Sequence, residues 1–259
     1  MAISSETRFL WKVLLQVLLT PYTLFLMLLG RATVKELLSP FSLLFEFLFE
    51  PRATITLVLL TCAAFIASAF IPGIESLVLH PGDILTLRLY TLITAGFLHA
   101  SIAHLAANML ALFVFGRVVE RSLGAGRTLL VYFGAMVLSG LFASVVYLAL
   151  HMDTGMVGAS GAIMGLVAAA VLLDPLYLTY SALIPLPIMV LGWLALLADF
   201  AGILGPADGI AHYAHLGGFL SVSVLVYLLR AADRQRMRRG LAINVVSALL
   251  LGAARWYLG

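Results

Sequence analysis

Residues 128–150 read TLLVYFGAMVLSGLFASVVYLAL, a run without a single charged side chain. A helix needs roughly 20 consecutive apolar residues to cross the hydrocarbon core of a bilayer. The apolar residues are continuous and do not alternate with polar ones, which fits a helix and excludes a strand of a membrane barrel. This stretch therefore predicts a transmembrane helix.

The whole chain has the same character. Of its 259 residues, 63% are hydrophobic and 10% are charged, whereas a soluble domain has roughly 45–50% and 25%. The net charge of +3 is small, and the basic residues form short clusters between apolar runs, which argues against nucleic-acid binding. The single cysteine, Cys62, has no partner for an intrachain disulfide. We expect an all-α, polytopic membrane protein that passes several times through a lipid bilayer, that of the cell membrane, and has no nucleic-acid partner.

The apolar segments divide the chain into three parts. Residues 51–230 are expected to form a six-helix core, preceded by a membrane-associated region at 1–50 and followed by a basic linker and an apolar helix at 231–259. The predicted spans are 53–71, 100–117, 127–150, 159–175, 181–200 and 211–230.

Three further segments are apolar but ambiguous. Pro21 and Pro40 interrupt the N-terminal region, which we interpret as an amphipathic or re-entrant region on the membrane, with a span at 9–29 as the alternative. The connection at 71–98 is too rich in Pro, Gly and polar residues to span and is expected to lie in the membrane interface. The stretch at 241–258 suits either a seventh span or an interfacial helix.

Basic residues follow the second and the sixth predicted spans. These residues are Arg117, Arg121 and Arg127, and then Arg230, Arg234, Arg236, Arg238 and Arg239. Four spans separate the two clusters, so both can lie in the cytoplasm, as the positive-inside rule requires. His99 and the loops at 151–158 and 201–211 are then expected on the outer face.

A serine lies between glycines where the fourth span begins, in Gly158-Ala-Ser160-Gly161. The N–H groups of the first helical turn are unpaired, and the helix dipole favours negative charge there, so a developing oxyanion beside the hydroxyl would be stabilised. Gly161 and Gly165 form a small-xxx-small pair that allows close helix packing. The alternative is a glycine-rich packing face with a serine N-cap.

The sixth span begins with two histidines, His212 and His215. An ionisable side chain in an apolar helix is costly and suggests function. The small residues Ala214, Gly217 and Gly218 would let a serine approach the His215 imidazole. The alternative is a structural hydrogen bond between helices, which is our interpretation of His212.

Polar side chains also begin the second span. His104 and Asn108 are one turn apart and share a helix face, where two donors would suit an oxyanion hole. If the helix already includes His99, that residue points elsewhere. Packing against another helix is an alternative, and metal ligation is a third. We expect no metal, because no carboxylate or thiolate lies at helical spacing from these histidines.

Nucleophile, base and oxyanion donors all fall at the outer ends of helices, and together they fit one acyl-transfer site. These residues resemble the rhomboid family of intramembrane serine proteases over roughly residues 50–230. The serine segment matches the Gly-x-Ser-Gly motif, Ala214-His215-Leu-Gly-Gly218 matches the catalytic histidine motif, and His99, His104 and Asn108 match the second-span signature.

The resemblance implies an intramembrane serine endopeptidase that cleaves transmembrane protein substrates with a Ser160/His215 dyad and requires no third acidic residue and no cofactor. His104, Asn108 and the Ser160 N–H would form the oxyanion hole, and His99 would support the site. Because His215 must be neutral to accept the serine proton, we expect activity to fall under acidic conditions.

Two positions depart from the family pattern. Tyr90-Thr91 replaces the Trp-Arg pair of many relatives, although Arg88 is close, and Met164 replaces an aromatic residue one turn after the serine. Neither change removes a catalytic atom.

Two other functions compete with proteolysis. One is a catalytically inactive rhomboid-like protein that binds membrane proteins in quality control, against which the retention of Ser160 and His215 argues. The other is a transporter or channel, which the absence of an internal repeat disfavours.

Overall fold

The computed structural model describes residues 5–179, 185–206 and 209–258, and these are largely helical. The helices before the site are α1 (Ser5–Leu28), α2 (Val34–Leu37), α3 (Ser39–Phe49), α4 (Arg52–Ser68), α5 (Thr91–Thr94), α6 (Ile102–Leu123) and α7 (Ala125–Ala149). They are followed by α8 (Ser160–Leu173), α9 (Ile188–Leu204), α10 (His212–Leu225) and α11 (Ala231–Leu258). The chain is thus a polytopic membrane helical bundle, as the sequence predicts.

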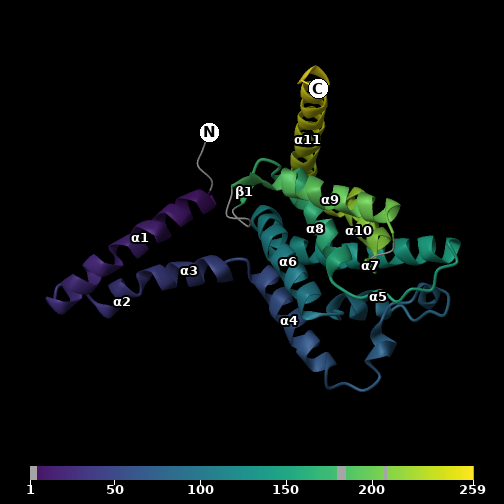
Figure 1. The fold of residues 1–259 in the computed structure, drawn as a ribbon, viewed down its shortest axis with the longest axis horizontal. Coiled ribbons are helices and arrows are strands. Elements are labelled where there is room, and N and C mark those ends of the chain that lie inside the picture. Colours follow the sequence, from purple (N-terminus) through teal and green to yellow (C-terminus); the bar gives the residue numbers. More distant parts are fainter. Residues whose placement is uncertain (1–4, 180–184, 207–208, 259) are drawn as a thin grey trace.

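The short helix α8 forms the centre of the bundle. It is hydrophobic on all sides, and 12 of its 14 residues are buried, as expected of a helix surrounded by others. It packs against α6, α7, α9, α10 and α11 (Figure 1). Ser160, its first residue, is therefore held by several helices at once.

Four helices are long and apolar enough to cross a membrane within the described residues, namely α1, α6, α7 and α11. The bent pair α3 and α4 would be a fifth span. The helices α8, α9 and α10 are apolar but shorter, and α10 continues into a 3-10 turn at Val226–Leu228.

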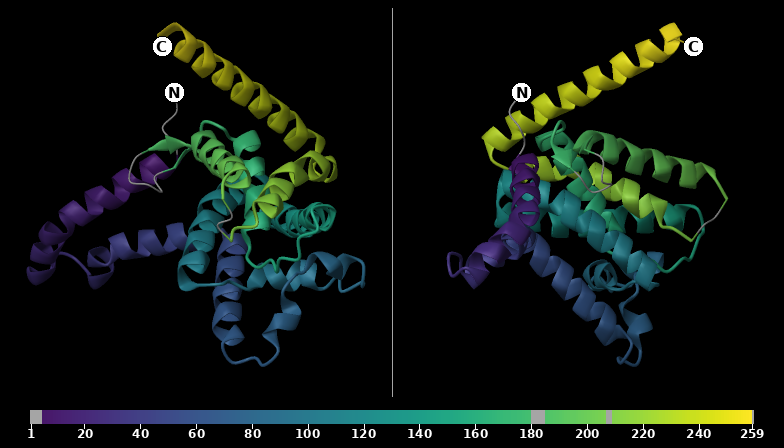
Figure 2. Two further views of the ribbon diagram at one scale, coloured as in Figure 1. Left: turned by 45° about the vertical axis from the view of Figure 1, so that its right-hand side comes forward. Right: turned by 60° about the vertical axis from the view of Figure 1, so that its left-hand side comes forward.

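The N-terminal helices α1 and α3 lie side by side and project from the bundle (Figures 1 and 2). The apolar part of α1, Trp11–Leu28, has no buried residue. Its side chains therefore suit a lipid environment, and both the interfacial arrangement and the span at 9–29 stay predictions.

Two predicted segments have different boundaries in the structure. The predicted span at 181–200 begins only at Ile188, because Pro187 directly precedes the helix and the strands β1 (Leu178–Thr179) and β2 (Leu186–Pro187) pair as an antiparallel hairpin. Residues 181–184 of that prediction lie outside the described residues. The predicted basic linker after residue 230 is instead the first part of the continuous helix α11.

The basic clusters take part in ion pairs at one end of the bundle. Arg127 pairs with Asp233 of α11, so the cluster after α6 and the one after α10 lie at the same end, as the predicted topology requires. Arg117 is only 1% exposed, and it is accommodated because it pairs with Glu50 at 3.0 Å and lies over the Phe47 ring.

The connection at 71–98 is irregular and contains three 3-10 turns: Ile74–Leu77, Pro81–Ile84 and Ala95–Phe97. Leu79 pairs with Met156 through backbone hydrogen bonds, which joins this connection to the loop before α8. Leu85 and Leu87 expose more than 70% of their surface, which suits a segment in contact with lipid.

Candidate active site

The position of Ser160 is set by the turn that precedes it. Gly158 has φ +117°, a conformation that a residue with a Cβ rarely adopts, and its N–H donates to the Ala95 carbonyl at 2.9 Å. The chain then enters α8 at Ser160. The hydroxyl thus lies at a helix N-terminus, where the local N–H groups are free to bind an anion.

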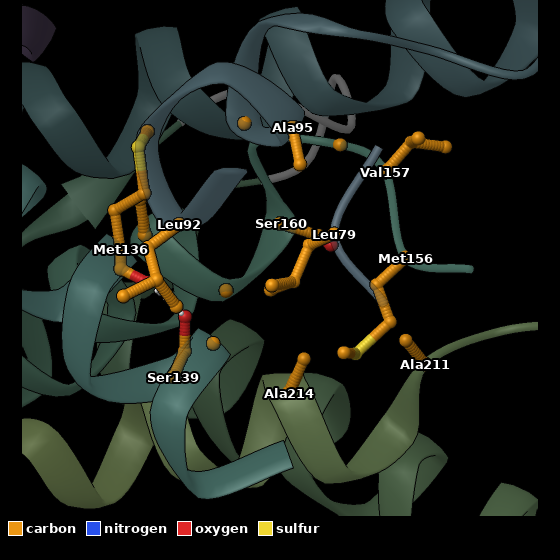
Figure 3. Close-up of a pocket in the computed structure, with 15 residues that line it drawn as sticks. Leu79, Leu92, Ala95, Met136, Ser139, Met156, Val157, Ser160, Ala211 and Ala214 are labelled. Atoms are coloured by element: carbon orange, nitrogen blue, oxygen red, sulfur yellow. Dashed lines mark hydrogen bonds between the residues drawn. The ribbon is translucent and has the colours of Figure 1, made fainter. Parts of the chain in front are cut away.

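Ser160 lines a cavity of ≈ 40 Å³, which is room for about three water molecules. The lining comes from the 71–98 connection, from α7, from the loop before α8 and from α10, as Figure 3 shows around Ser160. Ala214, the residue before His215, lines the same cavity. The serine and histidine segments therefore meet at one partly open cavity.

Glycines hold the serine helix and the histidine helix together. A Cβ on Gly218 of α10 would lie 1.9 Å from the Gly161 carbonyl oxygen of α8, and one on Gly161 would lie 3.5 Å from the Ala214 carbonyl oxygen. A Cβ on Gly165, one turn further along α8, would lie 3.4 Å from the Gly218 carbonyl oxygen. The two backbones are in direct contact, which larger residues would prevent.

His215 is oriented by a carboxylate that the sequence analysis overlooked. Its Nδ1 lies 2.7 Å from Oδ1 of Asp199 in α9, and Nδ1 of His212 lies 2.8 Å from the same oxygen. Asp199 is 6% exposed. Both histidines of α10 thus make a hydrogen bond to α9. The sequence had offered such a structural bond as the alternative to a catalytic role.

A signal for Asp199 was present in the sequence. It is a carboxylate within the apolar segment LGWLALLADF, residues 191–200, and ionisable residues in such segments suggest function. The histidines were assessed by this rule and Asp199 was not. Its pairing with α10, however, depends on how α9 packs, which spacing along one helix does not reveal.

His104 lies beside the serine. A Cβ on Gly158 would lie 2.9 Å from Nε2 of His104 and 3.8 Å from Oγ of Ser160, so both groups border the same small space. The His99 ring packs edge-on against the His104 ring, with centroids 5.0 Å apart. His99 is 8% exposed, and burial together with the charge of His104 lowers the pKa of His99 to about 4.

Asn108 is on the same helix face as His104 but is turned along its own helix. Its Nδ2 donates to the His104 carbonyl oxygen at 2.9 Å, and the side chain is buried. Its Oδ1 has no partner among the described residues. One of the two N–H donors of the amide is thus used by the backbone of its own helix, and the second is the donor that could serve an oxyanion hole.

Asp199, His212 and His215 are also the three groups that could hold a metal ion within the described residues. Spacing along one helix does not predict this cluster, because its members come from α9 and α10. The ring nitrogens lie at 2.7 and 2.8 Å from the carboxylate oxygen, whereas ligands bound at 2.0–2.2 Å around zinc are roughly 3.3 Å apart. We therefore interpret the cluster as hydrogen-bonded.

Arg88 anchors the 71–98 connection close to Tyr90-Thr91, where the chain departs from the family pattern. It donates to the Ser76 carbonyl oxygen at 2.7 Å and to the Tyr90 hydroxyl at 3.1 Å, and it pairs with Asp83 at 3.1 Å. The other departing residue, Met164, is buried in the main core cluster.

Comparison with known proteins identifies the family. The family model described as the rhomboid domain matches residues 86–232. Rhomboid-like protein 11, chloroplastic, of Arabidopsis thaliana is 31% identical over 188 residues, which cover 67% of this chain and 64% of that protein. Rhomboid-type serine protease 2 of Emericella nidulans is 32% identical over 61% of this chain and 30% of its own length.

A third relative, the putative rhomboid protease YdcA of Bacillus subtilis, is 44% identical over 30% of this chain and 37% of its own. The chain thus spans between about a third and two thirds of the length of these curated relatives. Because the domain match covers more than half of the chain and falls on the helices that carry Ser160 and His215, this membrane protein belongs to the rhomboid family.

Proposed function

We propose that this protein is an intramembrane serine endopeptidase in which Ser160 is the nucleophile and His215 the general base. The observation that carries the proposal is the orientation of His215. Since its Nδ1 faces Asp199, Nε2 is the nitrogen left to accept a proton from Ser160, whose helix is in backbone contact with that of His215. The names of two relatives, which describe proteases, support the same activity.

The reaction would proceed in two steps. His215 takes the Ser160 proton as Oγ attacks the scissile carbonyl, and it then gives that proton to the leaving amine as the C–N bond breaks. A water molecule, deprotonated by His215, then attacks the resulting ester, and His215 returns the proton to Oγ of Ser160 as the acyl–oxygen bond breaks and the acid leaves. The Ser160 N–H and His104 would stabilise the oxyanion, and Asn108 would join them through its second amide N–H.

The substrates would be transmembrane proteins, whose peptide bonds can reach a site buried among apolar helices. Gly158, Gly161 and Gly218 would support the site by keeping backbones close, and His99 by packing against His104. The compartment in this proposal is the cell membrane. Since the name of one relative places that relative in the chloroplast, fractionation of the source cells would test this assignment.

The test uses purified protein in liposomes, a single-span substrate and a fluorophosphonate probe. Wild-type protein should cleave and be labelled, Ser160→Ala should do neither, and His215→Ala should lose cleavage. Ser223→Ala is the matched control, because Ser223 is an exposed residue of α10 whose hydroxyl donates to the Leu220 carbonyl oxygen of its own helix. Folded wild-type protein that neither cleaves nor labels would instead indicate an inactive membrane-protein binder.

A further inference from the structure

We propose that Asp199 is a positioning residue for catalysis, so that the site works as an Asp199–His215–Ser160 triad in which His212 holds the carboxylate. This inference rests on the proposed protease function and extends it. Asp199 belongs to α9, whereas His212 and His215 belong to α10, so the arrangement couples a third helix to the serine and histidine helices.

The hydrogen-bond pattern fixes the tautomer of His215. An ionised carboxylate can only accept hydrogen bonds, so each imidazole in contact with Oδ1 must carry its proton on Nδ1. The proton-free nitrogen of His215 is then Nε2, the atom that can accept the Ser160 proton. In a Ser-His-Asp site this restraint also stabilises the imidazolium that forms during the reaction.

The second histidine explains how a single carboxylate is held in an apolar helix. His212 is 9% exposed and donates to the same oxygen as His215. Its ring packs directly on α9, because a Cβ on Gly202 would lie 2.1 Å from its Nε2. A buried carboxylate that accepts two N–H bonds is less costly than an unpaired one, and its rotation is restricted by two donors.

The other groups near His215 do not offer the same restraint. His104 of α6 is close enough for its charge to interact with that of His215, but it can supply no anion. Ser160 of α8 carries a neutral hydroxyl and can supply no anion either. Asp199 is therefore the one carboxylate among the described residues within hydrogen-bond distance of either histidine.

The decisive variant is Asp199→Asn, which keeps the size of the side chain and removes its charge. We expect kcat for a transmembrane substrate to fall roughly 100-fold or more, with little change in KM, because the restraint acts on the base and not on substrate binding. A purely structural role would leave kcat of the folded enzyme unchanged.

Three further variants complete the experiment. Asp199→Glu should restore part of kcat, and His212→Gln should cost only several-fold. Asp174→Asn, at the opposite end of α8 where the carboxylate faces Arg236, should keep the wild-type kcat. An Asp199→Asn protein that retains more than about a third of wild-type kcat would overturn the proposal.

A measurement without substrate separates this inference from the protease assignment. The nitrogen-15 spectrum of histidine-labelled protein should show the Nδ1–H tautomer of His215 in the wild type and its loss in Asp199→Asn. If the spectra change in this way but the protein has no protease activity, the protease assignment is rejected and the orientation of His215 by Asp199 is retained. A wild-type spectrum with the proton on Nε2 would reject the positioning role, and a spectrum altered by added zinc and restored by a chelator would favour the metal site.

Discussion

Gly218 of α10 lies against the backbone of Gly161 in α8 so closely that a Cβ on Gly218 would be 1.9 Å from the Gly161 carbonyl oxygen. The neighbour here is backbone, which cannot rotate away as a side chain can. The helices that carry His215 and Ser160 can keep their present separation only with glycine at this position.

Gly218→Ala should therefore separate α8 from α10. We expect a loss of about 1–3 kcal/mol in the free energy of unfolding, as for overpacked cores, and a larger loss of cleavage than of folded protein. Thermal unfolding in detergent and the rate of fluorophosphonate labelling measure the two effects. Gly126→Ala, where a Cβ would meet nothing within 4 Å, is the control, and equal behaviour of the two variants would contradict the prediction.

Gly158→Ala should reduce activity by a different route. The substitution places a Cβ 2.8 Å from the His104 ring and requires an unfavourable φ of +117°, which costs about 1–3 kcal/mol. Gly73→Ala is a matched control, because Gly73 also has a positive φ but has open space around it. Both variants should lose stability, but only Gly158→Ala should slow labelling of Ser160, and comparable labelling rates would disprove the role of this contact.

Arg88→Ala should loosen the 71–98 connection. The guanidinium bridges Ser76, Asp83 and Tyr90. Its removal therefore breaks the contacts that join these three residues. Hydrogen exchange in peptides from 71–98 should become roughly several-fold faster, and cleavage should weaken because this connection lines the Ser160 cavity. Arg255→Ala, in the exposed end of α11, should change neither quantity; unchanged exchange in Arg88→Ala would show that other contacts hold the connection.

His99 should make the protein less stable in acid. The pKa of His99 is lowered to about 4 by burial and by the nearby charge of His104, whereas the unfolded chain titrates at about 6.5. Between pH 4 and pH 6.5 His99 binds a proton in the unfolded chain but not in the folded protein. The stabilisation that neutral His99 gives the folded state is therefore complete above pH 6.5 and is lost as the pH falls toward 4.

The full loss from His99 would be roughly 3 kcal/mol, at about 1.4 kcal/mol per pKa unit. Unfolding midpoints of wild type and His99→Gln, measured between pH 7 and pH 4, should converge as the pH falls. His151→Asn changes an exposed histidine and should keep the wild-type slope. A wild-type slope in His99→Gln would exclude His99 as the source.

The sequence by itself determined the class of the molecule and most of its helices. Hydropathy depends on each residue and its close neighbours in the chain. Local composition therefore predicts the bilayer environment, the long helices α6 and α7 and the start of α8 at Ser160. The glycines of α8 and α10 likewise predicted close packing, because only small residues permit it.

Tertiary structure alone decided which distant side chains meet. The bond from Asp199 to His215 depends on the rotation and tilt of α9 against α10, and the bond from Asn108 to the His104 carbonyl depends on a side-chain rotamer. The delayed start of α9 depends on the pairing of β1 with β2. Such contacts come from packing between segments, and a pattern read along one helix carries no information on the neighbour that its polar residues will face.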